Sequence, residues 1–180
     1  MTPETTSEQK VDQARTRREV FEYSLAAILE QLNPERAICA FQEHGELTAQ
    51  ATHNFDPQTV FVAGEISTEL IKTIMRDGQG MCLVDAHDHP GLSNRTSVIL
   101  SGLRSIVCVP IIQVQESRHT IGLLYADNRI RAGAFDAQHQ QWLESLAQRM
   151  AARLAAVENP SPSVAASVGQ STAADQESWQ

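Results

Sequence analysis

Two β-type segments joined by a short loop constrain the fold of this chain more than any other feature. Residues 104–112 and 120–127 are rich in Val and Ile, which favour strands, and only residues 113–119 separate them. Parallel neighbours need a crossover connection of a dozen or more residues, so two strands joined this closely pair antiparallel. The sequence therefore predicts an antiparallel sheet at the centre of the fold.

Further strands and helices complete the pattern. Residues 36–41 and 47–53 form a second strand pair that turns at His44-Gly45, where glycine accepts the positive φ of a tight hairpin. A short apolar strand is predicted over residues 81–84. Apolar spacing and capping residues predict helices over 15–32, 67–77, 93–100 and 136–157. This order of elements is typical of an α+β fold with a central antiparallel sheet.

The first and last helices are the longest, and each carries one apolar stripe. The stripe residues, at helical spacing, are Phe21, Leu25, Ile28 and Leu32 in the first helix and Leu143, Leu146, Met150, Leu154 and Val157 in the last. Small apolar residues such as Ala151 lie on another side of the last helix. We expect both helices to pack on one face of the sheet and on a partner subunit, which Ala151 would face.

The two ends of the chain lack a pattern that could fold. Residues 1–14 are rich in Thr, Glu, Ser and Gln without an apolar period, which predicts a disordered leader. Residues 158–180 consist mainly of Ser, Ala, Pro and Gln and predict a disordered tail, in which Trp179 could dock on a partner. The folded domain is therefore predicted over residues 15–157.

Composition excludes several classes of protein. Apolar residues make up 42% of the chain, which is ordinary for a globular domain, and the net charge of −8 argues against nucleic-acid binding or a polybasic membrane anchor. Apolar runs fall far short of the roughly 20 residues that span a bilayer. An odd count of three cysteines without a signal peptide indicates a reducing, cytoplasmic compartment. Cys39, Cys82 and Cys108 lie in predicted strands, which favours inert core positions.

Three segments together resemble the GAF domain family. They are Ser101–Ile111, Ile121–Asn128 and Phe135–Ala147, and the likeness extends over about residues 15–157. The resemblance implies an antiparallel sheet of five to six strands, with the long N- and C-terminal helices on one face and a loop and short-helix pocket on the other. It also implies a dimer through the terminal helices and a small ligand in the pocket.

The sequence departs from three ligand-binding or catalytic subsets of that family. Cyclic-nucleotide binders carry a Lys where this chain has Arg129, and an Asp-Glu pair where it has His139-Gln140. The free-methionine sulfoxide reductases resemble the chain at Val84–His87, but their catalytic cysteine falls where it has Asn94, Arg95 or Thr96, and none of these can replace a thiolate. The chain also lacks the Cys-His pair of the bilin-binding subset.

The candidate ligand-binding residues are Asp85, His87, Asn94, Arg95 and Thr96. Asn94, Arg95 and Thr96 begin the predicted short helix, whose unpaired N–H groups and a guanidinium can hold an anion or a polar ligand. Plain capping by Ser93 explains the same residues equally well. The Asp and His residues between 85 and 89 have the donor types of a divalent-metal site, but a surface loop accounts for them better, so no metal and no cofactor is predicted.

We therefore expect a non-catalytic, GAF-type regulatory domain that binds a small ligand or serves as a dimerisation module. Because residues 15–157 are taken up by the sensory fold, its output is expected in trans, through a signalling partner protein. Two alternatives stay open: a reductase-like thiol enzyme and a purely structural interaction protein. Neither nucleic acid nor a membrane is expected as a partner.

Overall fold

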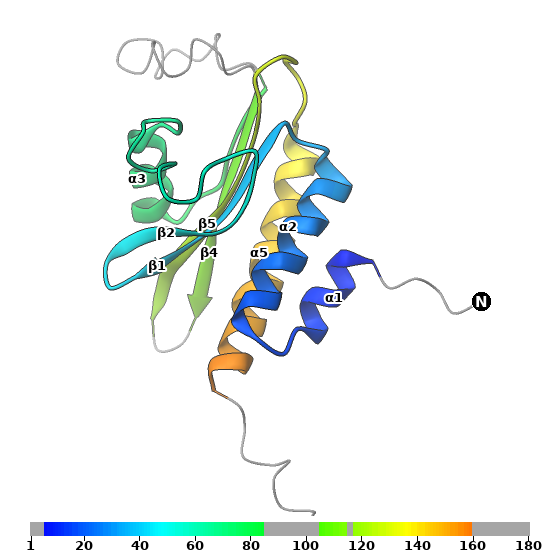
Figure 1. Ribbon diagram of the computed structural model, residues 1–180, viewed down its shortest axis with the longest axis vertical. Helices are drawn as coiled ribbons and strands as arrows, with labels where there is room; N and C mark the ends of the chain where they lie inside the picture. Colours follow the sequence, from blue (N-terminus) through cyan, green and yellow to red (C-terminus); the bar gives the residue numbers. More distant parts are fainter. Residues whose placement is uncertain (1–5, 85–104, 115–116, 160–180) are drawn as a thin grey trace, which may run out of the picture.

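The computed structural model describes residues 6–84, 105–114 and 117–159, which form a sheet flanked by helices (Figure 1). The described elements are, in order, α1 (Ser7–Gln13), α2 (Arg17–Leu32), β1 (Arg36–Glu43), β2 (Glu46–His53), α3 (Thr68–Asp77), β3 (Met81–Leu83), β4 (Ser105–Val114), β5 (Arg118–Asn128) and α5 (Ala137–Glu158). No helix in these ranges combines the length and the apolar character needed to cross a membrane.

The five strands form one antiparallel sheet in the order β2-β1-β5-β4-β3. The pairing of β4 with β5 confirms the prediction that started from their short connection. His44 and Gly45 turn the β1–β2 hairpin with φ values of 51° and 88°, which is the left-handed geometry expected of this dipeptide. The α+β class with a central antiparallel sheet is therefore confirmed.

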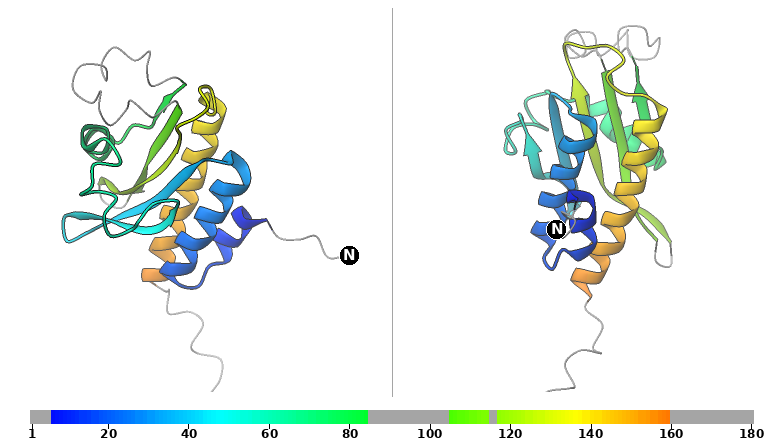
Figure 2. Two further views of the ribbon diagram at one scale, coloured as in Figure 1. Left: turned by 45° about the horizontal axis from the view of Figure 1, so that its top comes forward. Right: turned by 90° about the vertical axis from the view of Figure 1, so that its right-hand side faces the viewer.

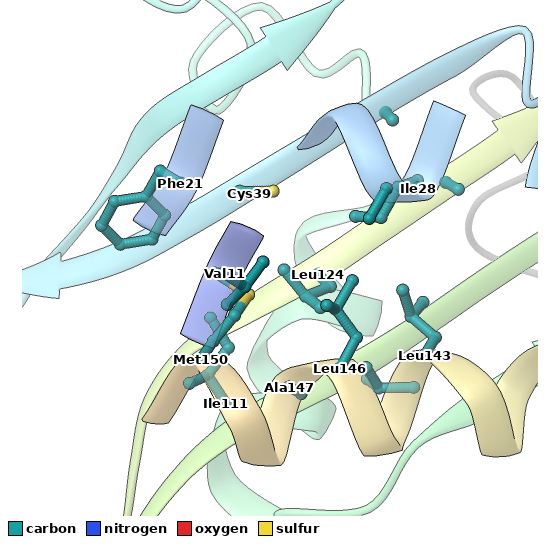
Figure 3. Close-up of a cluster of buried hydrophobic side chains, with 14 of the residues drawn as sticks. Val11, Phe21, Ile28, Cys39, Ile111, Leu124, Leu143, Leu146, Ala147 and Met150 are labelled. Carbon is teal, nitrogen blue, oxygen red and sulfur yellow. The ribbon is translucent and has the colours of Figure 1, made fainter. Parts of the chain in front are cut away.

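Helices cover both faces of the sheet. α2 and α5 lie side by side on one face, and α3 lies on the other (Figures 1 and 2). Between the sheet and the two long helices is a cluster of buried side chains, which we call the helical core cluster (Figure 3). It combines Phe21 and Ile28 of α2, Leu143 and Leu146 of α5, and inward-facing strand residues such as Leu124. The predicted apolar stripes therefore do pack on the sheet.

The predicted capping residues hold the helix ends. Ser67 accepts a hydrogen bond from the N–H of Leu70 at the start of α3, and Gly78 ends that helix with φ 62°. Asp136 caps α5 by accepting from the N–H groups of Gln138 and His139. Asn33 adopts φ 43° at the end of α2. These local signals fix where the long helices begin and end.

The prediction of a disordered leader is wrong for residues 7–13, which form helix α1. Thr6 and Gln9 make a reciprocal capping box, and Val11 is completely buried in the helical core cluster. α1 packs across α2 and α5, and Arg149 of α5 forms ion pairs with its acidic residues Glu8 and Asp12. A seven-residue helix with one large apolar residue shows no period, and isolated helices this short are marginal, so tertiary contacts stabilise it.

The position expected for Ala151 also needs correction. Ala151 is only 6% exposed and belongs to the helical core cluster, so its side chain does not face outward from the described part of the chain. The exposed side of α5 carries other residues instead, namely Gln141, Ser145, Gln148, Ala152 and Ala156.

Candidate functional site

The α3 face of the sheet carries a second apolar cluster, separate from the one under the long helices. Strand residues form its floor, and Phe55, Ile66, Leu70 and Ile74 from the segment around α3 cover it. The floor consists of Ile38, Ala40, Ile106, Cys108, Leu123 and Tyr125, all at most 2% exposed. This is the face on which a ligand pocket is expected.

Three polar residues interrupt that apolar surface at one end of the sheet. Arg36 of β1 lies opposite Asp127 of β5 in the strand register and forms a two-pronged ion pair with it. Its Nε donates to Asp127 Oδ1 over 2.9 Å and its Nη2 to Oδ2 over 2.6 Å. The Tyr125 hydroxyl donates to the same Oδ2 over 2.7 Å. Asp127 and Tyr125 are fully buried, and Arg36 nearly so. We call Arg36, Tyr125 and Asp127 the strand-end cluster.

Two further groups surround the strand-end cluster. Glu65 accepts from Arg36 Nη1 over 3.4 Å and remains partly exposed. The Phe55 ring lies 4.2 Å from the guanidinium carbon of Arg36 and meets the Tyr125 ring edge-to-face at 6.2 Å. Cation–π contact of this kind stabilises a guanidinium that has lost part of its water. The cluster is thus held from the sheet and from the segment before α3.

Burial determines the protonation of the strand-end cluster. Desolvation tends to lower the pKa of Arg36, but the hydrogen bond and charge of Asp127 outweigh it and raise that pKa. Burial raises the pKa of Asp127, while the hydrogen bonds and charge of Arg36 oppose the rise. Burial, reinforced by the charge of Asp127, raises the pKa of Tyr125 well above its ordinary value. Because Asp127 accepts three hydrogen bonds, the cluster holds an ionised carboxylate between a guanidinium and a neutral phenol.

The three cysteines of the chain all lie in strands, as predicted, and none is activated. Burial raises the pKa of Cys39 and of Cys108 far above the ordinary thiol range, and both are completely buried. Cys82 is half-buried, and desolvation together with the charge of Asp136 raises its pKa as well. A nucleophilic thiol needs a lowered pKa. The prediction of inert core positions is thus confirmed for Cys39 and Cys108.

Comparison with known proteins identifies the family. The GAF domain family matches residues 16–154. The chain belongs to the GAF domain family. No curated protein matches the sequence.

Several solved structures share this fold. A methyl-accepting chemotaxis protein, residues 122 to 287, superposes with a TM-score of 0.63 at 16% identity, over 84% of this chain and 96% of that one. The GAF domain of a phosphoenolpyruvate-protein phosphotransferase from Coxiella burnetii superposes with a TM-score of 0.61 at 20% identity, over 84% of this chain and 90% of that one. A free methionine-R-sulfoxide reductase from Neisseria meningitidis, in complex with its substrate, superposes with a TM-score of 0.63 at 18% identity, over 84% of this chain and 86% of that one. At these identities the likeness establishes the fold alone.

The candidate ligand residues of this GAF domain, Asp85, His87, Asn94, Arg95 and Thr96, lie outside the described residues. The residues that flank them in sequence are anchored beside the strand-end cluster. Ser105 Oγ donates to the carbonyl of Leu83 over 3.1 Å and accepts from the N–H of Phe135 over 3.1 Å. The N–H of Gly133 donates to the carbonyl of Val84 over 2.7 Å. The chain thus leaves and re-enters the sheet at the end that carries Asp127. Across the described ranges, no three His, Cys, Asp or Glu side chains gather as a metal site would require.

Sequence reasoning missed the strand-end cluster, although a signal for it exists. Tyr125 and Asp127 stand two residues apart in the otherwise apolar stretch Ile121–Asp127 of β5, so they face the same side of the sheet. A charged residue at a core-facing position needs a partner, and Arg36 at the start of another apolar strand is a natural one. The pairing of β1 with β5, which places them opposite each other, is not written in either strand alone.

Proposed function

We propose that this GAF domain is a non-catalytic regulatory domain that binds a small ligand on the α3 face of its sheet. The observation that carries the proposal is the strand-end cluster, a buried ion pair with a phenol in an apolar surface, next to the anchors of the predicted ligand residues. Buried charges cost desolvation energy and are rarely kept for stability alone. A polar ligand held near Arg36 and Glu65 would use them.

The thiol chemistry supports a role without catalysis. Every cysteine has a raised pKa and two are completely buried, so none is poised to attack a sulfoxide. The similarity in fold to a free methionine-R-sulfoxide reductase makes thiol catalysis the alternative to test. We expect no turnover of free methionine sulfoxide with a thiol reductant. Turnover that disappears in a Cys82→Ser variant would contradict the proposal.

Ligand binding can be tested with variants of the predicted and the observed residues. Native mass spectrometry of the purified full chain, together with a thermal-shift panel of small polar metabolites, would detect a ligand. We expect Arg95→Ala and Glu65→Gln to weaken binding at least tenfold, because each removes a polar group from the proposed site. Arg131→Ala, at an exposed position beyond β5, is the matched control. If Arg95→Ala, Glu65→Gln and the control all bind alike, the site lies elsewhere.

Regulation further implies a partner, and one feature favours association through α5. Between Gln141 and Ala156 the exposed residues of this helix are only Gln, Ser and Ala, an uncharged surface that costs little to desolvate. The partner in the proposed homodimer is a second copy, with a signalling protein acting in trans. Light scattering at micromolar concentration tests the dimer. A glutamate at Ala152 should dissociate it without unfolding the domain, whereas a strict monomer for the unsubstituted chain refutes it.

A further inference from the structure

A cavity lies at the opposite end of the sheet from the strand-end cluster. β3 pairs only with Ile106–Cys108 of β4, so the rest of β4 has no strand beside it on that side within the described residues. There a cavity of about 380 Å³ opens between β4, α5 and the link from α3 to β3. Its size falls at the lower end of the range for small-molecule sites. We call it the edge cavity.

Two opposite charges line the edge cavity without neutralising each other. Arg118 begins β5, and Glu144 lies on α5. Both residues are described, and no ion pair within 4.0 Å joins them. Instead, Arg118 Nη2 donates to the carbonyl of Gly78 over 3.4 Å, and Glu144 Oε1 accepts from the Gln140 amide over 2.8 Å. Each charged group is therefore held at its own end of the cavity.

The link between α3 and β3 contacts both charges. The Arg118 guanidinium contacts Gly78, while a Cβ added at Gly80 would lie 2.5 Å from Glu144 Oε1. Two residues span at most about 7 Å, so the two contact points on the link are no farther apart than that. A small zwitterion with an ammonium and a carboxylate on one carbon can accept a hydrogen bond at one of these ends and donate one at the other. The absence of a side chain at Gly80 lets the Glu144 carboxylate approach the link closely.

Part of the remaining wall of the edge cavity is apolar, and the amide side chains of Gln79 and Gln148 complete the lining. Pro110, Ile112 and Val114 present their side chains along β4, and Val114 is 74% exposed. An apolar side chain that covered them would remove this surface from water. We propose that the edge cavity binds a free α-amino acid with an apolar side chain, its carboxylate on Arg118, its ammonium on Glu144 and its side chain against β4. This site is separate from the one proposed on the α3 face.

The proposal predicts which parts of the ligand are required. L-leucine, titrated against the full chain by isothermal calorimetry, should bind, and heteronuclear NMR should place the shifts at residues 78–80 and around Arg118 and Glu144. 4-Methylpentanoate lacks the ammonium and isoamylamine lacks the carboxylate, so each should bind at least tenfold more weakly. Equal binding of either analogue would overturn the assignment of the two charges.

Substitutions of the residues that line the edge cavity test whether leucine binds there. Glu144→Gln and Arg118→Gln should each weaken leucine binding at least tenfold, since each removes one charge. Gly80→Ala should also weaken it, because the added methyl group would displace the Glu144 carboxylate. Arg131→Gln is the control for charge, as it lies outside the edge cavity. No leucine binding at 10 mM, or binding unchanged in Glu144→Gln and Arg118→Gln, refutes the proposal. NMR shifts confined to the α3 face would refute it while supporting the first site.

Discussion

Removing the buried carboxylate of Asp127 should destabilise the domain far more than removing a surface charge. Asp127→Asn keeps the shape of the side chain but leaves the Arg36 guanidinium, which is almost entirely buried, without its counter-charge. Breaking a buried ion pair from one side typically costs about 3–5 kcal/mol. At about 2–4 °C per kcal/mol for a domain of this size, the melting temperature should fall on the order of 10 °C.

The assay is thermal and urea unfolding followed by circular dichroism, with a matched surface variant and a rescue. Arg76 and Asp77 form a two-pronged pair as well, at 2.7 and 3.2 Å, but they are exposed, so Arg76→Met should leave the unfolding midpoint unchanged. The triple variant Arg36→Met, Tyr125→Phe and Asp127→Leu replaces the strand-end cluster with apolar groups.

The rescue decides which physical cause operates. If the unpaired buried charge causes the loss, the triple variant should recover most of the stability lost in Asp127→Asn, because an apolar replacement leaves nothing unsatisfied. If Asp127→Asn costs under about 1 kcal/mol, the pair is not desolvated as the structure indicates. If the triple variant is no more stable than Asp127→Asn, altered packing causes the loss and the reasoning fails.

Three further predictions concern other parts of the fold. Gly122→Ala should prevent or strongly weaken folding, since its Cβ would lie 2.2 Å from the Ala40 carbonyl oxygen; a soluble variant with an unchanged melting temperature would contradict this. The hydrogen bond from Arg149 lowers the pKa of Asp12, so this contribution to α1 docking is present above the ordinary carboxylate range and lost as pH falls below about 4. Amide exchange in α1 should therefore accelerate in acid before the sheet opens, and Arg149→Met should remove that pH dependence. Cys39 and Cys108 should resist a thiol reagent at neutral pH until the domain unfolds, because both are buried with raised pKa; rapid labelling of the folded protein would refute this.

The sequence predicts the parts of this fold that depend on local chemistry. Val- and Ile-rich runs, the His44-Gly45 turn and the caps at Ser67 and Asp136 each act within a few residues, and the structure confirms them. Helix α1 escaped prediction because Arg149, which holds it, lies far away in sequence. Apart from the local capping box of Thr6 and Gln9, its stability comes from contacts that only the folded chain provides.

Part of the candidate site could likewise be predicted from the sequence, and part of it could not. The α3 face could be expected from the family resemblance, whereas the strand-end cluster depends on the pairing of β1 with β5, which places Arg36 beside Asp127. The edge cavity exists because β3 is only three residues long, and no sequence pattern states where a pairing strand will stop. The register between strands and the length of each strand are therefore the features that a single sequence does not predict. The five predicted ligand residues, from Asp85 to Thr96, stay predictions.

The position of β5 in the middle of the sheet has a consequence for how the chain folds. β1 and β2 are made early and can pair at once, but the other edge of β1 waits for β5, which ends at Asn128. At roughly 5–20 residues per second of synthesis, that edge stays open for several seconds on the ribosome. An unpaired apolar strand is a template for association with other chains. The nascent protein is thus most vulnerable to aggregation before β5 emerges, and a pause in translation between residues 54 and 117 should lower the soluble yield.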